Sequence, residues 1–356
     1  MDWLTIVVVV FLILGGVDYL IGNRFGVGEE FKKGISMLGP MTLTMSGMLI
    51  LAPAISYMLQ GMVVNLPDFI DPSIIASSLL ANDMGGAPLS VELCRNNEIG
   101  MFNAMVVSSM MGCTVSFTIP VALGIVDKKY HKDMILGILC GIVTIPFGSF
   151  VGGLIAGINF LNLIKNLIPL IVFSLLIAVA LFKIPDVCIK VFSVIGSIIN
   201  ILIIIGLVAG IFEFLTGIKV IPHTDTLENS SRIVINASCV MAGMFPLVKI
   251  LSQILKKLLC VFSEKAGINE TAAMGFMASL ATSFTTYNMV KDMDRKGIIL
   301  NSAFFVSGGF VLAGHMAFTL AYNPDYVLSV VAGKLIAGVL AVILALAMYN
   351  MVKYKI

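Results

Sequence analysis

Apolar runs of eighteen or more residues recur along nearly the whole of this chain. Runs of that length predict membrane-crossing helices, because about 20 helical residues at 1.5 Å each span roughly 30 Å of hydrocarbon. Only 12% of the 356 residues are charged and 59% are hydrophobic, whereas a soluble domain is roughly 25% charged. The sequence therefore predicts an all-α polytopic membrane protein. Nine segments are long enough to span: 3–21, 37–59, 99–126, 133–159, 165–182, 187–215, 233–255, 298–321 and 326–350.

The chain has little room for anything outside the membrane. Its longest polar stretch, Lys219 to Arg232, has the length of a loop, so we expect a single transmembrane domain over residues 1–356. The first residues lack the basic region and small-residue cleavage site of a signal peptide. We therefore expect the apolar run from Leu4 to Ile21 to be a first spanning helix.

Two further apolar segments, 72–94 and 270–295, are interrupted by polar residues near their middles. In the first, Asp71-Pro72 predicts a helix start. The run from Asn82 to Gly86 predicts a break, and Pro88 can begin a second arm. About 11 residues before the break span roughly 16 Å, close to half the hydrocarbon thickness. The break should therefore lie near the midplane, whether the segment crosses the membrane or turns back.

The basic residues distinguish crossing segments from re-entrant hairpins. If both segments are hairpins and the N-terminus is outside, 16 lysines and arginines lie inside and four outside. If both crossed, the best split would be 12 to 8. Cytoplasmic loops carry an excess of Lys and Arg, so we expect hairpins in a multi-pass protein of the cytoplasmic membrane, with a cytoplasmic C-terminus. The four outer residues are Arg95, Lys165, Lys219 and Arg232.

Weak internal matches recur at a spacing of about 193–201 residues. Five crossings then precede the second copy, so its orientation is inverted. We expect repeat 1 at about 1–160, a linker helix at about 165–183, and repeat 2 at about 187–350. Inverted repeats with paired interrupted helices are typical of secondary transporters, which bind substrate where the breaks meet. The matches are Gly47 with Gly243, Leu80-Ala81 with Leu280-Ala281, Asn103 with Asn301, Ser109 with Ser307, and Phe117-Thr118 with Phe318-Thr319.

Six strings stand out along the chain: Leu79 to Gly86, Phe117 to Ile125, Gly141 to Pro146, Met293-Asp294, Ala313 to His315 and Gly333 to Leu335. With these strings the chain closely resembles the ethanolamine-utilisation permease family, EutH, over nearly its whole length. The resemblance implies uptake of ethanolamine, a small hydroxylated amine that is protonated at neutral pH. This sequence departs from the family pattern in two places. Between Ala281 and Asn288 two amides and a proline of the family pattern are missing, and Gly314 stands where the family has an acid. A related amine such as choline is therefore an alternative cargo.

A protonated amino alcohol needs an anion for its ammonium group and hydrogen-bonding partners for its hydroxyl. Asp83 is the candidate anion, because a carboxylate at the midplane is costly and suggests a function; alternatively it only caps the second arm. Gly85 and Gly86 permit a turn and close backbone approach, or only helix packing. The predicted substrate-binding residues are Asn82, Asp83, Gly85, Gly86, Thr282, Ser283, Thr285, Thr286, Tyr287 and Asn288.

Two further ionisable residues lie within predicted spans. Lys334 is expected about nine residues into the last span, as a partner of Asp83, a structural ion pair or a snorkelling lysine. His315 is expected near the outer end of its span, as a proton relay or a packing residue.

The leading hypothesis is a carrier that works by alternating access; a channel or a non-transporting scaffold is an alternative. An enzyme is not expected, because the three histidines have no HExxH spacing. We expect no catalytic residue, metal or cofactor, since no cysteine pair has CxxC spacing. The expected partners are a small ethanolamine-like amine, the lipid bilayer and a second copy in a homodimer. Nucleic acid is not expected, because no basic stripe alternates with aromatic residues.

Overall fold

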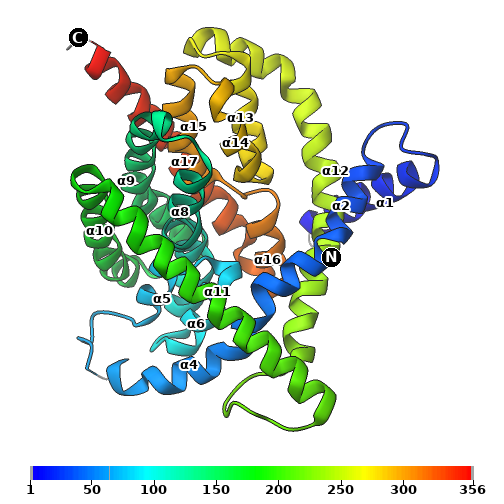
Figure 1. Ribbon diagram of the computed structural model, residues 1–356, viewed down its shortest axis with the longest axis vertical. Helices are drawn as coiled ribbons and strands as arrows, with labels where there is room; N and C mark the ends of the chain where they lie inside the picture. The colour runs from blue at the N-terminus through cyan, green and yellow to red at the C-terminus, as the bar shows by residue number, and fades with distance from the viewer. Residues whose placement is uncertain (1–2, 64, 354–356) are drawn as a thin grey trace.

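The computed structural model describes residues 3–63 and 65–353, and all regular structure in that part of the chain is helical (Figure 1). Residues 1–2 and 354–356, on which the predicted positions of the two termini depend, lie outside it. The helices are α1 Trp3–Leu20, α2 Gly28–Ser36, α3 Leu38–Met41, η1 Thr42–Ser46, α4 Gly47–Val63, α5 Ser73–Leu79, η2 Asn82–Met84, α6 Gly86–Leu93, α7 Asn97–Phe102, η3 Asn103–Gly112, η4 Thr114–Thr118, α8 Ile119–Ile125, η5 Lys128–Tyr130, α9 His131–Ile155, α10 Phe160–Lys183, α11 Pro185–Thr216, α12 Leu227–Ala266, α13 Glu270–Ala281, α14 Ser283–Met289, η6 Val290–Asp292, α15 Arg295–Gly308, α16 Gly314–Tyr322, η7 Pro324–Tyr326 and α17 Val327–Lys353.

Long apolar helices confirm the predicted all-α polytopic membrane protein. Seven helical stretches among the described residues are long and apolar enough to cross a membrane, and α1 is a shorter apolar helix. These eight correspond to eight of the nine predicted spans. The seven long stretches are Gly28–Gly61, Asn97–Ile125, Lys128–Ile155, Phe160–Lys183, Pro185–Thr216, Leu227–Ile254 and Pro324–Met351.

The ninth predicted span, 298–321, is not one helix. It is broken between α15 and α16, and Phe310 in the break has a positive φ of 60°. The backbone N–H groups of Phe310 and Leu312 donate to carbonyl oxygens of Ser279 and Leu280 in α13, both at 2.8 Å. The break therefore satisfies the last carbonyls of α13, which a helix end leaves without partners. A prediction based on the length of an apolar run could not detect these hydrogen bonds between distant segments.

Both interrupted segments are hairpins, and they enter from opposite ends of the molecule, α5–α6 at the bottom and α13–α14 at the top (Figure 1). In the first, Ser90 Oγ donates to the Ser73 carbonyl oxygen at 3.2 Å and joins the two arms. In the second, Thr286 Oγ1 donates to the Gly275 carbonyl oxygen at 2.9 Å. The second break is shorter than the predicted polar tip, because only Thr282 leaves the helical conformation between the arms.

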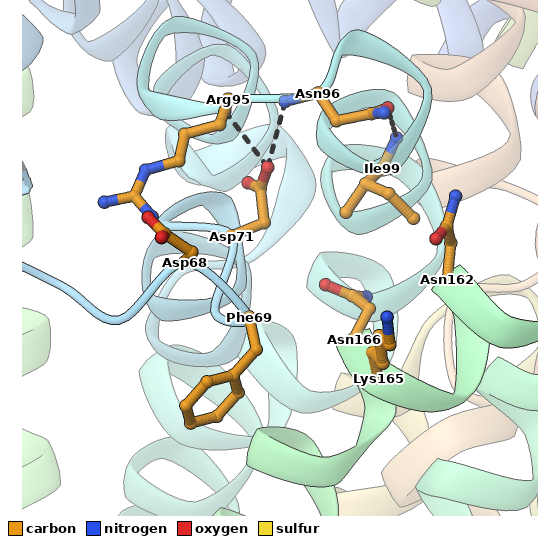
Figure 2. Close-up of a pocket in the computed structure, with 9 residues that line it drawn as sticks. All are labelled: Asp68, Phe69, Asp71, Arg95, Asn96, Ile99, Asn162, Lys165 and Asn166. Atoms are coloured by element: carbon orange, nitrogen blue, oxygen red, sulfur yellow. Dashed lines mark hydrogen bonds and ion pairs between the residues drawn. The ribbon is translucent and has the colours of Figure 1, made fainter.

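The open ends of the hairpins are closed by an acid and an amide whose positions are exchanged between the repeats. The carboxylate of Asp71 accepts the backbone N–H groups of Arg95 and Asn96, both at 3.0 Å (Figure 2). In the second repeat Asp294 follows the hairpin, and its carboxylate accepts the N–H of Asn269 at 2.8 Å. Asp71 and Asn269 are 198 residues apart, and so are Asn96 and Asp294. The two hairpins are therefore closed at matching positions, but the acid precedes the first hairpin and follows the second.

Each repeat also packs against a helix of the other. A Cβ at Gly47 of α4 would collide with the carbonyl oxygen of Ile203 in α11, so these backbones are in close contact. A Cβ at Gly243 of α12 would likewise collide with the carbonyl oxygen of Val8 in α1. Gly243 follows Gly47 by 196 residues, and Ile203 follows Val8 by 195 residues. The two contacts therefore join matching positions of the predicted repeats. The two copies are therefore interlocked, and small residues permit the approach, as is common between membrane helices.

The centre of the fold is formed by α9, α15 and α17. Gly148 packs on the carbonyl oxygen of Gly333, and Gly152 faces that of Ser329, so α9 and α17 run antiparallel. Thr144 Oγ1 continues this line by donating to the Ala337 carbonyl oxygen at 3.1 Å. Thr144 and Ala337 are 193 residues apart, which lies within the spacing expected between the two repeats.

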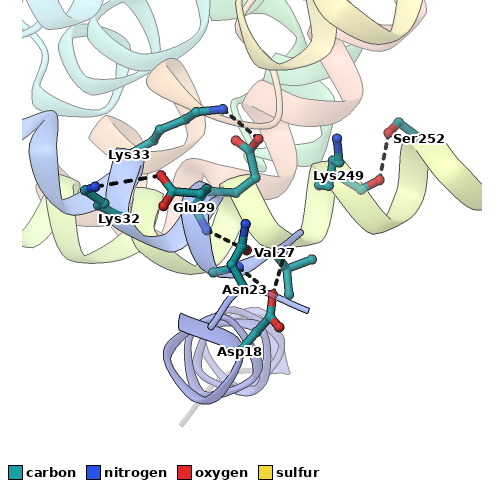
Figure 3. Close-up of polar contacts among 10 residues, drawn as sticks. Asp18, Asn23, Val27, Glu29, Lys32, Lys33, Lys249 and Ser252 are labelled. Atoms are coloured by element: carbon teal, nitrogen blue, oxygen red, sulfur yellow. Dashed lines mark hydrogen bonds and ion pairs between the residues drawn. The ribbon is translucent and has the colours of Figure 1, made fainter. Parts of the chain in front are cut away.

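Asp18 closes the turn from α1 to α2 (Figure 3). Its carboxylate accepts the N–H groups of Phe25, Val27 and Gly28 at 2.8–2.9 Å, and its side chain is buried. An anion at the start of α2 complements the partial positive charge of a helix N-terminus.

Candidate functional site

A cavity of about 460 Å³ lies where the tips of the two hairpins meet. The first hairpin contributes Asp83 and Met84, and the second contributes Ala281 and Thr282. The break between α15 and α16, η4, α12 and the segment before α4 complete the wall. Their lining residues are Met37, Pro40, Met41, Thr44, Met45, Cys113, Phe117, Met241, Phe245, Phe310, Gly314 and His315, with Phe284 from α14.

Local backbone geometry brings Asp83 to this cavity. Leu80 ends α5 in an extended conformation, and Gly85 begins α6 with a φ of +101°, which favours glycine. The single turn η2 between them carries Asp83. No side chain caps α6, so Asp83 does not act as its N-cap, which was the structural alternative. Gly86 lies so close to Ser108 Oγ and the Leu80 carbonyl that a Cβ would not fit.

The widened helical turns of η3 and η4 hold the first tip in place. Ser108 Oγ donates to the Leu80 carbonyl oxygen, and Ser116 Oγ accepts the N–H of Ala81 at 3.1 Å. Gly112 lies against the same Leu80 carbonyl. Wide turns of this kind occur frequently at functional sites. They let side-chain hydroxyls satisfy the backbone groups that the break leaves open.

Three of the phenylalanines that line the cavity with Asp83 are in contact with one another. The ring centroid of Phe117 lies 5.1 Å from that of Phe284 and 5.5 Å from that of Phe310, both in edge-to-face geometry. The Phe310 ring is also 5.5 Å from the imidazole of His315. The sequence does not single out these rings, because 22 phenylalanines are spread through the apolar runs. In the structure Phe117 lies in η4, Phe284 at the start of α14 and Phe310 in the break before α16.

Several buried polar atoms around the tips have no hydrogen-bond partner among the described residues. They are the amide atoms of Asn82, Ser283 Oγ, Tyr287 Oη and His315 Nδ1. Tyr287 Oη lies near the hydroxyls of Thr118 and Ser283, but without regular hydrogen-bond geometry. Because an unsatisfied buried polar group costs about 1–3 kcal/mol, this cluster indicates a place where water or a ligand supplies the missing partners.

Lys334 is buried behind the cavity wall, with 1% of its surface exposed. Its Nζ donates to the carbonyl oxygen of Ser109 in η3 at 2.7 Å. It interacts electrostatically with Asp83 and His315, yet no ion pair within 4 Å joins Lys334 to an acid in the described part of the chain. A positive charge therefore lies close to the site without neutralising Asp83 directly.

The predicted site residues fall into three groups. Asp83, Thr282 and His315 line the cavity. His315 was expected near the end of its span, but the break places it at the second position of α16 and buries it. Gly85, Gly86, Asn82, Ser283, Thr286 and Tyr287 form or pack behind the tips, where Thr286 is hydrogen-bonded to Ser279. Thr285 and Asn288 are exposed on α14, and Asn288 Nδ2 donates to the Phe284 carbonyl oxygen.

No cluster of three or more His, Cys, Asp or Glu side chains that could hold a metal ion occurs among the residues described. The cavity offers one carboxylate, aromatic rings, two threonine hydroxyls and an imidazole. Such a set can bind a small organic cation.

Two hairpins that border one cavity, in a chain of long apolar helices, define the class of this protein as a polytopic membrane transporter. The profile of the family described as "Ethanolamine utilisation protein, EutH" matches residues 2–348. The chain is 42% identical to the Probable ethanolamine permease EutH of Listeria monocytogenes, over 98% of this chain and 94% of the relative. The chain belongs to the EutH family.

Two further relatives extend the comparison. The Probable ethanolamine permease EutH of Escherichia coli is 34% identical over 89% of this chain and 84% of its own length. The Uncharacterized protein YxeR of Bacillus subtilis is 36% identical over 96% of this chain and 92% of its own length. No solved structure matches this chain.

Proposed function

We propose that this protein carries ethanolamine, or a closely related protonated amino alcohol, by alternating access. The observation that carries the proposal is the carboxylate of Asp83 in a cavity lined by aromatic and thioether side chains. A carboxylate that is desolvated in a membrane protein favours an organic cation over water. Aromatic rings add to the attraction of an ammonium group. The names of the relatives from Listeria monocytogenes and Escherichia coli support ethanolamine as the amine.

The hydroxyl of the substrate needs hydrogen-bonding partners within the cavity. Thr282 from the second hairpin and His315 from α16 line the cavity together with Asp83, and His315 Nδ1 has no partner among the described residues. A substrate that bridges Asp83 and these groups would touch both hairpins. Each hairpin can then close the site from its own end of the molecule, as alternating access requires.

Choline is the second candidate. Phe117, Phe284 and Phe310 form a connected aromatic cluster in the cavity that Asp83 also lines, and quaternary ammonium groups are commonly recognised by aromatic rings. Thr282 and His315 provide the same partners for the choline hydroxyl.

Uptake of labelled ethanolamine into proteoliposomes tests the proposal. Saturable uptake is expected, and Asp83→Asn should reduce it roughly 10- to 100-fold, because a contact to a charged group contributes about 1.5–3 kcal/mol. Asp325→Asn is the matched control, since this acid lies in η7 and does not line the cavity. Its uptake should equal that of the parent.

The other outcomes separate the alternatives. Flux that does not saturate would indicate a channel, and absence of amine flux under any gradient would refute transport. Competition by unlabelled choline, propanolamine and serinol measures which amine the site prefers. The predicted homodimer stays a prediction.

A further inference from the structure

A second pocket, of about 600 Å³, lies at the end of the molecule where the second hairpin opens. It is formed by α9, α10 and α11, together with the first residue of α15. Its charged and titratable lining residues are four basic side chains and two acids, namely Lys128, His131, Lys132 and Arg295 with Asp133 and Asp186. Leucines, Phe182 and isoleucines line the remainder. The pocket is thus charged at one end and apolar along its length.

The apolar part follows one face of α9. Lys132, Leu136 and Leu139 are spaced by four and three residues, so they lie one above another on the same helix face. From Lys132 to Leu139 this stripe descends about 10 Å along the helix. Leu181 of α10 and Ile189 of α11 form the opposite wall. A groove of this form leads from the water interface into the depth of a lipid leaflet.

The charges of this lining are not all neutralised within the protein. Arg295 Nε donates to Asp133 Oδ1 at 2.9 Å, which pairs those two residues. Lys128 and Lys132 make no ion pair with the acids of the described chain, and neither does Asp186 on the opposite wall. The lining therefore has an excess of one positive charge, carried by two unpaired ammonium groups from η5 and α9.

We propose that this pocket binds a membrane phospholipid with one net negative charge, such as phosphatidylglycerol. Its phosphodiester lies between Lys128 and Lys132, and one acyl chain follows the groove past Leu136 and Leu139. A ligand with a single negative charge neutralises the excess charge of the lining. Basic pockets between membrane helices recognise lipid headgroups in this way. The apolar walls favour a lipid over a soluble phosphate, and this site is separate from the substrate cavity.

Native mass spectrometry of the full-length protein in detergent tests this site. Phosphatidylglycerol, phosphatidylethanolamine, phosphatidylcholine and inorganic phosphate are titrated separately. Phosphatidylglycerol should be retained most strongly, and the double variant Lys128→Gln/Lys132→Gln should weaken its binding on the order of 30-fold, about 1 kcal/mol per lysine. The control Lys183→Gln/Lys190→Gln removes the same charge near the same end, but from residues outside the pocket. Its binding should equal that of the parent.

A second variant tests the groove independently of the charges. Ile189→Trp places a larger side chain in the groove and leaves both lysines in place, so it should reduce phosphatidylglycerol binding at least fivefold. Equal binding of phosphatidylglycerol and phosphatidylcholine would overturn the proposal. So would equal losses in the two lysine double variants, unchanged binding in Ile189→Trp, or inorganic phosphate that binds as tightly as the lipid.

Discussion

The residues that distinguish this protein from an inert helical bundle are a few ionisable side chains held in its centre. Asp83, Lys334 and His315 come from η2, α17 and α16, respectively. Isolated charges in a low-dielectric interior cost several kcal/mol unless they find partners. Lys334 has one backbone carbonyl as its partner, and Asp83 faces the cavity. Their arrangement leaves the carboxylate available to a cation while a fixed positive charge remains nearby.

A double-mutant cycle measures how strongly these two charges are coupled. Lys334→Gln keeps a hydrogen-bond donor for the Ser109 carbonyl oxygen but removes the charge. If the two groups stabilise each other, Asp83→Asn and Lys334→Gln together should change thermal stability less than the sum of the single variants, by more than about 0.5 kcal/mol. Thermal unfolding of the four purified proteins provides the comparison. Strict additivity would mean that Lys334 acts only as a structural residue.

At the scale of elements, the hairpins are held at their open ends by an acid that accepts backbone N–H groups. Asp71→Asn and Asp294→Asn should each destabilise the protein by about 1–3 kcal/mol, because hydrogen bonds to a charged acceptor are replaced by weaker ones. The exposed Asp127→Asn serves as the control. The thermal midpoints of purified variants measure the effect.

The acid and the amide occupy exchanged positions at the open ends of the two hairpins, and this exchange allows a sharper test of how the hairpins are closed. The double variant Asn269→Asp/Asp294→Asn gives the second hairpin the order of acid and amide found in the first. It should recover at least part of the stability that Asp294→Asn loses. No recovery would show that the two closures are not equivalent, although they occupy matching positions in the repeats.

The two hairpins also show what sequence reasoning can reach. The first could be predicted, since Asp71-Pro72 and Gly85-Gly86 have local conformational preferences that do not depend on the rest of the fold. Asp83 could be identified because a carboxylate within an apolar run needs an explanation. The second break at Thr282 has no glycine or proline, and its length is determined by hydrogen bonds from Phe310 and Leu312.

The missed parts of the site depend on the same tertiary contacts. The break in the span 298–321 brings Phe310 and His315 to the cavity, but the sequence around it reads as one apolar run. Phe117 and Phe284 lie on different repeats and meet only in the folded protein. A pattern of residue types within one segment contains no information about contacts with a distant segment.

At the scale of the whole molecule, the two ends differ in charge. Among the described residues, the lysines and arginines expected at the end where the first hairpin opens are Arg95, Lys165, Lys219 and Arg232. Its acids outnumber them, and they are Asp68, Asp71, Glu92, Glu98, Glu213, Asp225, Glu228 and Asp325. Because an excess of negative charge raises the local concentration of cations, this end is suited to receive a protonated amine. The positive-inside rule independently assigns the same end to the outside.

Labelling on intact cells tests this orientation. Asp68 is fully exposed at the acidic end, and Lys129 is exposed at the opposite end. A membrane-impermeant maleimide should label Asp68→Cys in whole cells, whereas it should label Lys129→Cys only after the cells are opened. The parent chain measures the background from native cysteines such as half-buried Cys94. The reverse pattern would place the basic end outside. The acidic end would then face the cytoplasm, and its charge would favour capture of the amine from the inside.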